Sequence, residues 1–168
     1  MADLQLLAAV ENGDREFFID TIRDNPGLLL IREAASGRNL FQLAVQFRTE
    51  KIFNLIYGLD DNTRVELLRP SDNAGNNILH IAAQLSPSNH LSKISGSALK
   101  MQREAQWFEE IKSLLPEPEL VVQKNNDQVT PRQAFEVSHE PLRKEGEEWM
   151  KYTATACSFV AALIATVT

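Results

Sequence analysis

Short clusters of apolar residues, separated by polar turns, run along most of this chain. In one cluster, at 78–83, the apolar side chains fall on one side of a short helix. The turn before it, at 73–76, contains Gly75 and asparagines, which adopt positive φ at little cost. Apolar clusters with helical spacing also occur at 4–22 and 40–57. The pattern predicts an all-α fold of short helices joined by tight turns.

The segment 72–84 resembles a known repeat. It reads DNAGNNILHIAAQ, and the ankyrin repeat follows the pattern D-x-x-G-x-T-P-L-H-x-A-A. The residues at matching positions are Asp72, Gly75, Leu79, His80, Ala82 and Ala83. The anchoring alanine recurs as Ala9, Ala44 and Ala82, at steps of 35 and 38 residues. Both steps are close to the ankyrin period of about 33 residues, so the resemblance extends to the preceding units.

Two further turns fit the same repeat. Gly37 lies in the turn before the apolar helix at 40–45. Thr130 and Pro131 match the Thr-Pro of the family, with proline at a helix start where its missing N–H costs nothing, while Gln128 replaces the usual glycine. We expect an ankyrin-repeat solenoid of about four units at 1–148, with hairpin tips and first helices forming the binding face. The signature residues, all expected to be structural, are Gly37, Ala44, Asp72, Gly75, His80, Ala82, Thr130 and Pro131.

The third unit carries an insertion at about 86–103. Its first part, 86–97, is rich in Ser, Pro, Asn and Gly and has little apolar area to bury, so we expect a mobile loop. A helix pattern resumes at Ala98, and the apolar stripe that begins at Trp107 is expected to belong to the repeat core. In the fourth unit, the second half at 142–150 is polar and charged, as a terminal unit can be.

The last residues predict a hydrophobic C-terminal helix. Residues 152–168 contain no charged side chain, although a full membrane span needs about 20 apolar residues. We expect Trp149 and Tyr152 at the level of the lipid headgroups, with the membrane segment continuing through Val160 to Val167. The basic residues before it are Arg143, Lys144 and Lys151. They place the repeats on the cytosolic side by the positive-inside rule. The alternative is a helix that packs on the repeats of a soluble cytoplasmic adaptor.

The C-terminal segment resembles one particular family. Residues 145–167 read EGEEWMKYTATACSFVAALIATV, which is similar to the segment after the last repeat in plant ankyrin-repeat membrane proteins of the accelerated-cell-death type, which carry a C-terminal PGG domain. The spacer at 95–111 resembles theirs too. The resemblance implies that 149–168 begins a PGG domain, with a partial transmembrane helix and a chain truncated in its first span. It also implies a place at the plasma membrane and a role in plant defence, cell-death or stress signalling.

Charge and chemistry narrow the function. A net charge of −6 argues against a general nucleic-acid binder, which needs basic patches to neutralise phosphates. The histidines His80, His90 and His139 lack metal-ligand spacing, and we find no catalytic motif. Cys157, the only cysteine, is expected to be a small buried residue rather than an acylation site. We expect a non-enzymatic, membrane-tethered module that binds a protein partner, with no cofactor, metal or small-molecule substrate.

Overall fold

The computed structural model describes residues 2–167 and is built from helices. The elements in chain order are α1 (Ala2–Asn12), α2 (Arg15–Asp24), the 3-10 helix η1 (Pro26–Leu30), α3 (Leu40–Gln46), α4 (Glu50–Phe53), η2 (Asn54–Gly58), α5 (Asp61–Leu68), α6 (Ile78–Ala82), α7 (Ser88–Leu91), α8 (Ser97–Ser113), η3 (Pro118–Val121) and α9 (Pro131–Val167). Across these residues there is no strand, only an isolated bridge between Arg32 and Asn39. The prediction of an all-α fold is confirmed.

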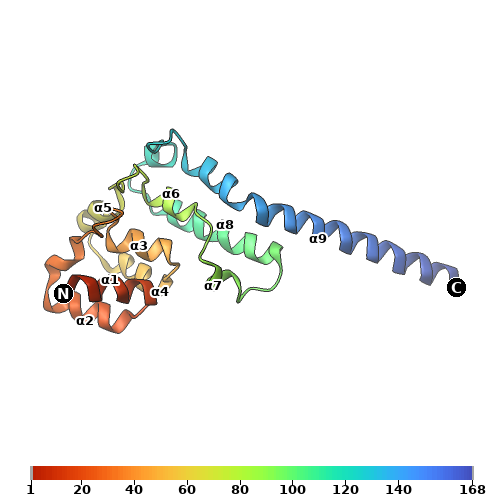
Figure 1. Ribbon diagram of the computed structural model, residues 1–168, viewed down its shortest axis with the longest axis horizontal. Coiled ribbons are helices and arrows are strands. Elements are labelled where there is room, and N and C mark those ends of the chain that lie inside the picture. Colours follow the sequence, from red (N-terminus) through yellow and green to blue (C-terminus); the bar gives the residue numbers. More distant parts are fainter. Residues whose placement is uncertain (1, 168) are drawn as a thin grey trace.

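The helices before α9 pack in successive pairs. α1 contacts α2, α3 contacts α4, and α6 contacts α8. The first helices of the pairs also pack on one another, α1 on α3 and α3 on α6, and the start of α9 continues this row by packing on α6. In Figure 1 the pairs follow one another across the body of the molecule toward α9. This arrangement buries the apolar side of each short helix against its neighbours, because no single pair can cover its own apolar face.

A row of aromatic side chains runs through the core and joins the pairs. Phe18 on α2 meets Phe41 on α3 edge to face with ring centroids 6.4 Å apart, and Phe41 meets Phe53 at 6.3 Å. Phe53 then meets Trp107 on α8 at 5.5 Å. Edge-to-face pairs add about 0.5–1.5 kcal/mol each beyond burial. The expected core role of the stripe at Trp107 is borne out, since Trp107, Phe108 and Ile111 are buried, and Leu114 and Leu115 pack partly buried against the core.

Side-chain caps fix where the short helices begin. The Asp14 carboxylate accepts the backbone N–H of Phe17 at the start of α2. Asp60 likewise accepts the N–H of Thr63 and so begins α5. Such caps satisfy backbone donors that have no partner within the helix.

The insertion is more ordered than the sequence predicted. Within 86–97, residues Ser88–Leu91 form the single turn α7. Ser86 and Ser97 are both buried, and the backbone N–H of Ser86 donates to the Glu104 carboxylate at 3.0 Å. A polar bond, which a low apolar content does not exclude, therefore anchors the first end of this segment at Ser86, and burial of Ser97 holds the other end. α8 begins at Ser97, one residue before the expected start.

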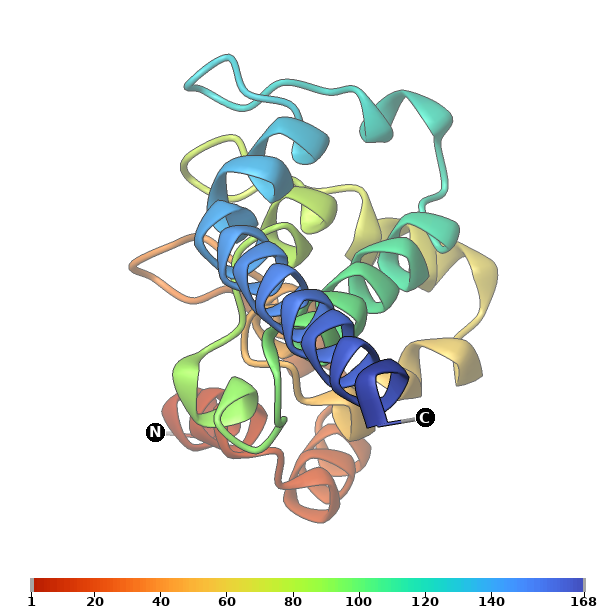
Figure 2. The same cartoon turned by 90° about the vertical axis from the view of Figure 1, so that its right-hand side faces the viewer.

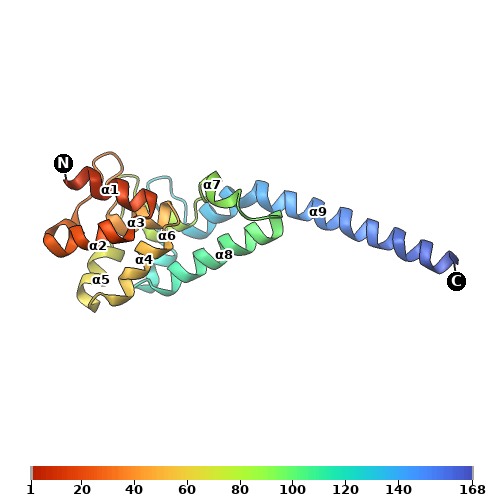
Figure 3. The ribbon, with the colours of Figure 1, turned by 90° about the horizontal axis from the view of Figure 1, so that it is seen from below.

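The fourth unit differs from the expected helix–loop–helix. α9 runs without a break from Pro131 to Val167, through Pro141, so there is no second helix at 142–150 and no break in the helix at 148/149. Leu142 and Gly146 are buried, and α9 packs extensively on α8. This packing holds the helix together where proline removes one backbone bond. The C-terminal half of α9 projects beyond the body in Figures 1 and 3, and Figure 2 looks back toward the body from that end.

Candidate binding surface and membrane helix

The three hairpin loops that precede first helices are stacked by backbone hydrogen bonds. The N–H of Asn73 donates to the Ser36 carbonyl at 2.9 Å, and the N–H of Asn126 donates to the Ala74 carbonyl at 3.1 Å. Each loop contains one residue with positive φ: Gly37 (74°), Gly75 (75°) and Gln128 (61°). The loop tips Ala35, Asn73, Ala74, Asn126 and Asp127 are exposed. The sequence located these tips correctly, including Gln128 in the place of a glycine.

Close approach explains the two glycines. A Cβ on Gly37 would lie 2.3 Å from Oδ1 of Asn73, and a Cβ on Gly75 would lie 2.5 Å from Oδ1 of Asn126. Both residues also have positive φ, where side chains are strained. Each loop therefore presses against an asparagine of the next loop, and a side chain at either glycine would separate the loops.

Asparagine caps form a second contact that recurs along the stack. Asn39 caps α3, and its Nδ2 donates to the Leu67 carbonyl at 2.7 Å. Asn77 caps α6, and its Nδ2 donates to the Leu120 carbonyl at 2.9 Å. Leu67 lies eight residues before Gly75, and Leu120 lies eight residues before Gln128. The same bond is therefore made in the same register by two successive units.

His80 bridges two units from the core. Its side chain is 1% exposed, and Nε2 donates to the Val129 carbonyl at 2.9 Å, while Nδ1 lies 3.3 Å from the N–H of Asn77. Burial lowers the pKa of His80, although the bond to Val129 partly opposes this. A neutral ring with its proton on Nε2 fits these partners. Gln42 and Gln133 occupy the equivalent cap positions on α3 and α9.

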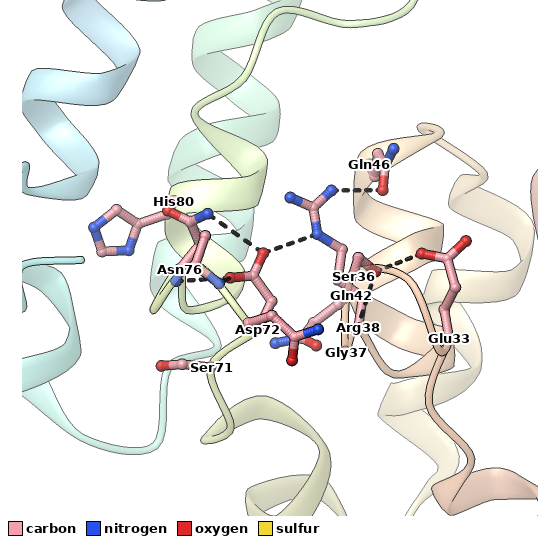
Figure 4. A network of polar contacts seen from close by, with 12 residues as sticks. Glu33, Ser36, Gly37, Arg38, Gln42, Gln46, Ser71, Asp72, Asn76 and His80 are labelled. Carbon is pink, nitrogen blue, oxygen red and sulfur yellow. Dashed lines mark hydrogen bonds and ion pairs between the residues drawn. The ribbon is translucent and has the colours of Figure 1, made fainter. Parts of the chain in front are cut away.

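Asp72 organises the loop between α5 and α6 (Figure 4). One carboxylate oxygen accepts the N–H groups of Ala74 and Asn76, each at 2.9 Å, and the other accepts Arg38 Nε at 3.0 Å. The Arg38 guanidinium continues to Gln46 on α3. Burial acts to raise the pKa of Asp72, but the bonds from Asn76, Arg38 and Ala74 outweigh it and lower the pKa. The signature residues Gly37, Asp72 and Gly75 thus meet in one polar network at the loop surface.

The other signature residues lie deeper in the stack. Ala44 and Ala82 are fully buried at the ends of their helices, where their small side chains allow close packing. Thr130 exchanges capping bonds with Gln133, and Pro131 is the first residue of α9. The structure brings the loop residues together at one edge and keeps the alanines in the core.

A buried charged cluster was missed by the sequence reasoning. Oε2 of Glu104 on α8 accepts Arg48 Nη2 at 2.9 Å and lies 3.0 Å from His139 Nε2 on α9. All three side chains are at least nine-tenths buried. Burial acts to raise the pKa of Glu104, but bonds from His139, Arg48 and Ser86 outweigh it and lower the pKa. No motif spacing in the sequence links these three positions. The one unusual local feature is the positive φ of Arg48 (56°), in a turn equivalent to the one that contains Gly13.

A hollow of about 620 Å³ lies beside this cluster, between α7 and α8. Its walls include Leu91, Ile94 and Leu99 from the insertion and Trp107 from α8. Arg48 and Glu104 reach its lining as well. Volumes of this size are typical of ligand pockets, but the ionised groups in it are already engaged with one another.

The projecting half of α9 is apolar and uncovered. The predicted membrane residues Trp149, Tyr152, Val160 and Val167 are 58%, 76%, 54% and 87% exposed. An 18-residue window of this helix has a mean hydropathy of 1.4 and none of it is buried. By length and composition it is suited to cross a membrane. Cys157, expected to be buried, is exposed on this helix, because nothing in the chain packs there.

Within residues 2–167, no group of three or more His, Cys, Asp or Glu side chains is arranged to hold a metal ion. The sequence matches no protein-family model and no curated protein.

Proposed function

We propose that the stacked helix pairs are an ankyrin-type solenoid of about four units that binds a protein partner. Two observations support this: the loop-to-loop hydrogen bonds that recur from unit to unit, and the asparagine caps that recur in one register. Repeat stacks of this kind present extended surfaces for recognition rather than a catalytic pocket. The binding face is formed by the exposed hairpin tips and the adjoining first helices.

The solenoid is tethered to a membrane by α9, and the exposed apolar half of that helix is the observation that carries this proposal. Exposed apolar patches of this extent mark partner or membrane contacts. Residues 152–167 reach about 24 Å, somewhat less than a hydrocarbon core of about 30 Å. Thr155 and Ser158 return their hydroxyls to carbonyls of the preceding turn, at 2.9 Å each, so burial in lipid leaves them satisfied.

Basic residues and the C-terminal sequence bear on the side of the membrane and on the biological role. By the positive-inside rule, Lys151 with Arg143 and Lys144 supports a cytosolic position for the solenoid. The resemblance of 145–167 to PGG-domain ankyrin proteins supports a role in plant defence, cell-death or stress signalling at the plasma membrane. We assign no enzymatic activity, cofactor or nucleic-acid ligand.

Carbonate extraction of the full chain with membranes tests the tether. Arginine in place of Val160 costs about 2.5–3.5 kcal/mol at the centre of an inserted helix, so Val160→Arg should move the protein to the soluble fraction. Val137→Arg is the matched control, because Val137 is 76% exposed on the same helix but outside the apolar half. It should remain in the membrane fraction. If the unchanged protein is soluble and monomeric, the tether is wrong and the soluble adaptor replaces it.

A further inference from the structure

The insertion has a positive net charge, whereas the chain as a whole is acidic. The chain has 23 acidic residues, yet none lies between Asp72 and Glu104. This stretch holds Lys93, which is exposed, Lys100, which is half-buried, and Arg103, which pairs with Glu50. We refer to residues 85–103 as the basic segment. Its charge is opposite to that of the chain as a whole, which favours an anionic partner.

The basic segment lies at the end of the body from which the apolar half of α9 projects. In Figures 1 and 3 the connection from α7 to α8 is the part of the body nearest to that half. Gly146 on α9 packs here, since a Cβ on it would lie 3.7 Å from Oγ of Ser97. From Gly146 to Tyr152, where the uncharged stretch begins, the helix rises only about 9 Å. The segment is therefore at the depth of lipid headgroups when the apolar half is inserted.

The surface of the segment combines apolar and basic groups. Leu91, Ile94 and Leu99 line the hollow beside α8, and Leu99 is 57% exposed. Lys93 and Lys100 lie next to them in the chain. Lysines beside half-exposed leucines are typical of segments that lie at a membrane surface.

The part of α9 that precedes its apolar half has no net positive charge. Between Arg143 and Lys151 it carries three basic and three acidic residues. Arg143 and Lys144 are also held by Glu140, and Arg143 by Glu147 as well. Lys93 and Lys100 of the basic segment therefore add positive charge to a part of α9 that has no net charge of its own.

We propose that the basic segment is a second membrane contact, which binds the anionic phospholipid headgroups of the bilayer entered by α9. This rests on the proposed tether. The two contacts differ in chemistry: α9 binds through apolar burial, which tolerates salt, and the basic segment binds through charge, which salt weakens within a Debye length of about 8–10 Å. Together they fix the orientation of the solenoid above the membrane.

The test measures partition of the full chain into vesicles of neutral phosphatidylcholine and into vesicles that also contain phosphatidylserine. We expect tighter binding to the anionic vesicles, with the difference abolished by high salt. Each of Lys93→Gln and Lys100→Gln should weaken binding to anionic vesicles about fivefold and leave binding to neutral vesicles unchanged. Lys124→Gln is the control. Lys124 is exposed as well, but it precedes the N-terminus of α9, at the opposite end of that helix from the apolar half. Equal binding to both vesicle types, or equal effects of all three variants, would overturn the proposal.

The two tryptophans separate this proposal from the tether. Trp149 lies beside the apolar half of α9, and Trp107 lines the hollow next to the basic segment. In Trp107→Phe protein, quenching of Trp149 by brominated acyl chains in neutral vesicles reports insertion of α9. Quenching without any preference for phosphatidylserine refutes the lipid contact and leaves the tether standing. No quenching in either vesicle type refutes both.

Discussion

Removing the charge of Glu104 should destabilise the fold strongly. The carboxylate is 3% exposed and receives Arg48 Nη2 at 2.9 Å and the Ser86 N–H at 3.0 Å, with His139 Nε2 at 3.0 Å. Glu104→Gln keeps the size of the side chain but leaves Arg48 as a buried charge without its counter-ion. Breaking a buried ion pair in this way costs about 3–5 kcal/mol. The loss should also loosen the insertion and α9, because Ser86 and His139 belong to those segments.

The assay is urea unfolding of the full chain in detergent, followed by the fluorescence of Trp107 in a Trp149→Phe background. Trp107 is a local reporter, because the Arg48 guanidinium lies 5.7 Å from its ring centroid. The control is Glu109→Gln on the same helix, where the carboxylate is 64% exposed and pairs with Lys112. Exposed pairs of this kind contribute about 0–1 kcal/mol. If Glu104→Gln costs no more than Glu109→Gln, the reasoning about the buried cluster is wrong.

The remaining predictions concern acid sensitivity and the contacts between units. The pKa of Glu104 is lowered in the fold, so its contribution to stability is complete above the ordinary pKa of about 4.5 and is lost as the pH falls through the lowered pKa. Between pH 6 and pH 3 the urea midpoint should therefore fall less in Glu104→Gln protein than in the unchanged protein. His80→Ala should cost about 1–3 kcal/mol and lower the melting temperature, and His80→Gln should cost less because glutamine fills the equivalent position on α3; an unchanged melting curve for His80→Ala would contradict the structural role. Gly75→Ala should cost about 1–2 kcal/mol or more. Gly58→Ala should be nearly neutral, because a Cβ there would have no atom within 4 Å. Equal urea midpoints for the two variants would refute the close packing of the loops.

The sequence by itself determined the local features. Turn residues and apolar spacing located α3 and α6, because a cap and a short apolar face are encoded within a few neighbouring residues. The positions of Gly37 and Gly75 followed from the same pattern, since positive φ is a local requirement. The apolar half of α9 was likewise evident from composition alone.

Tertiary structure decided what depends on distant residues. Arg48 lies in the turn between α3 and α4, Glu104 on α8 and His139 on α9, and no local pattern shows that their side chains meet. The same holds for the insertion, whose polar composition predicts a mobile loop but whose Ser86 N–H finds a buried carboxylate on α8. α9 continues through Pro141 because packing against α8 offsets the loss of the single backbone hydrogen bond that proline removes. Helix propensity, which depends on the local sequence, does not include this packing.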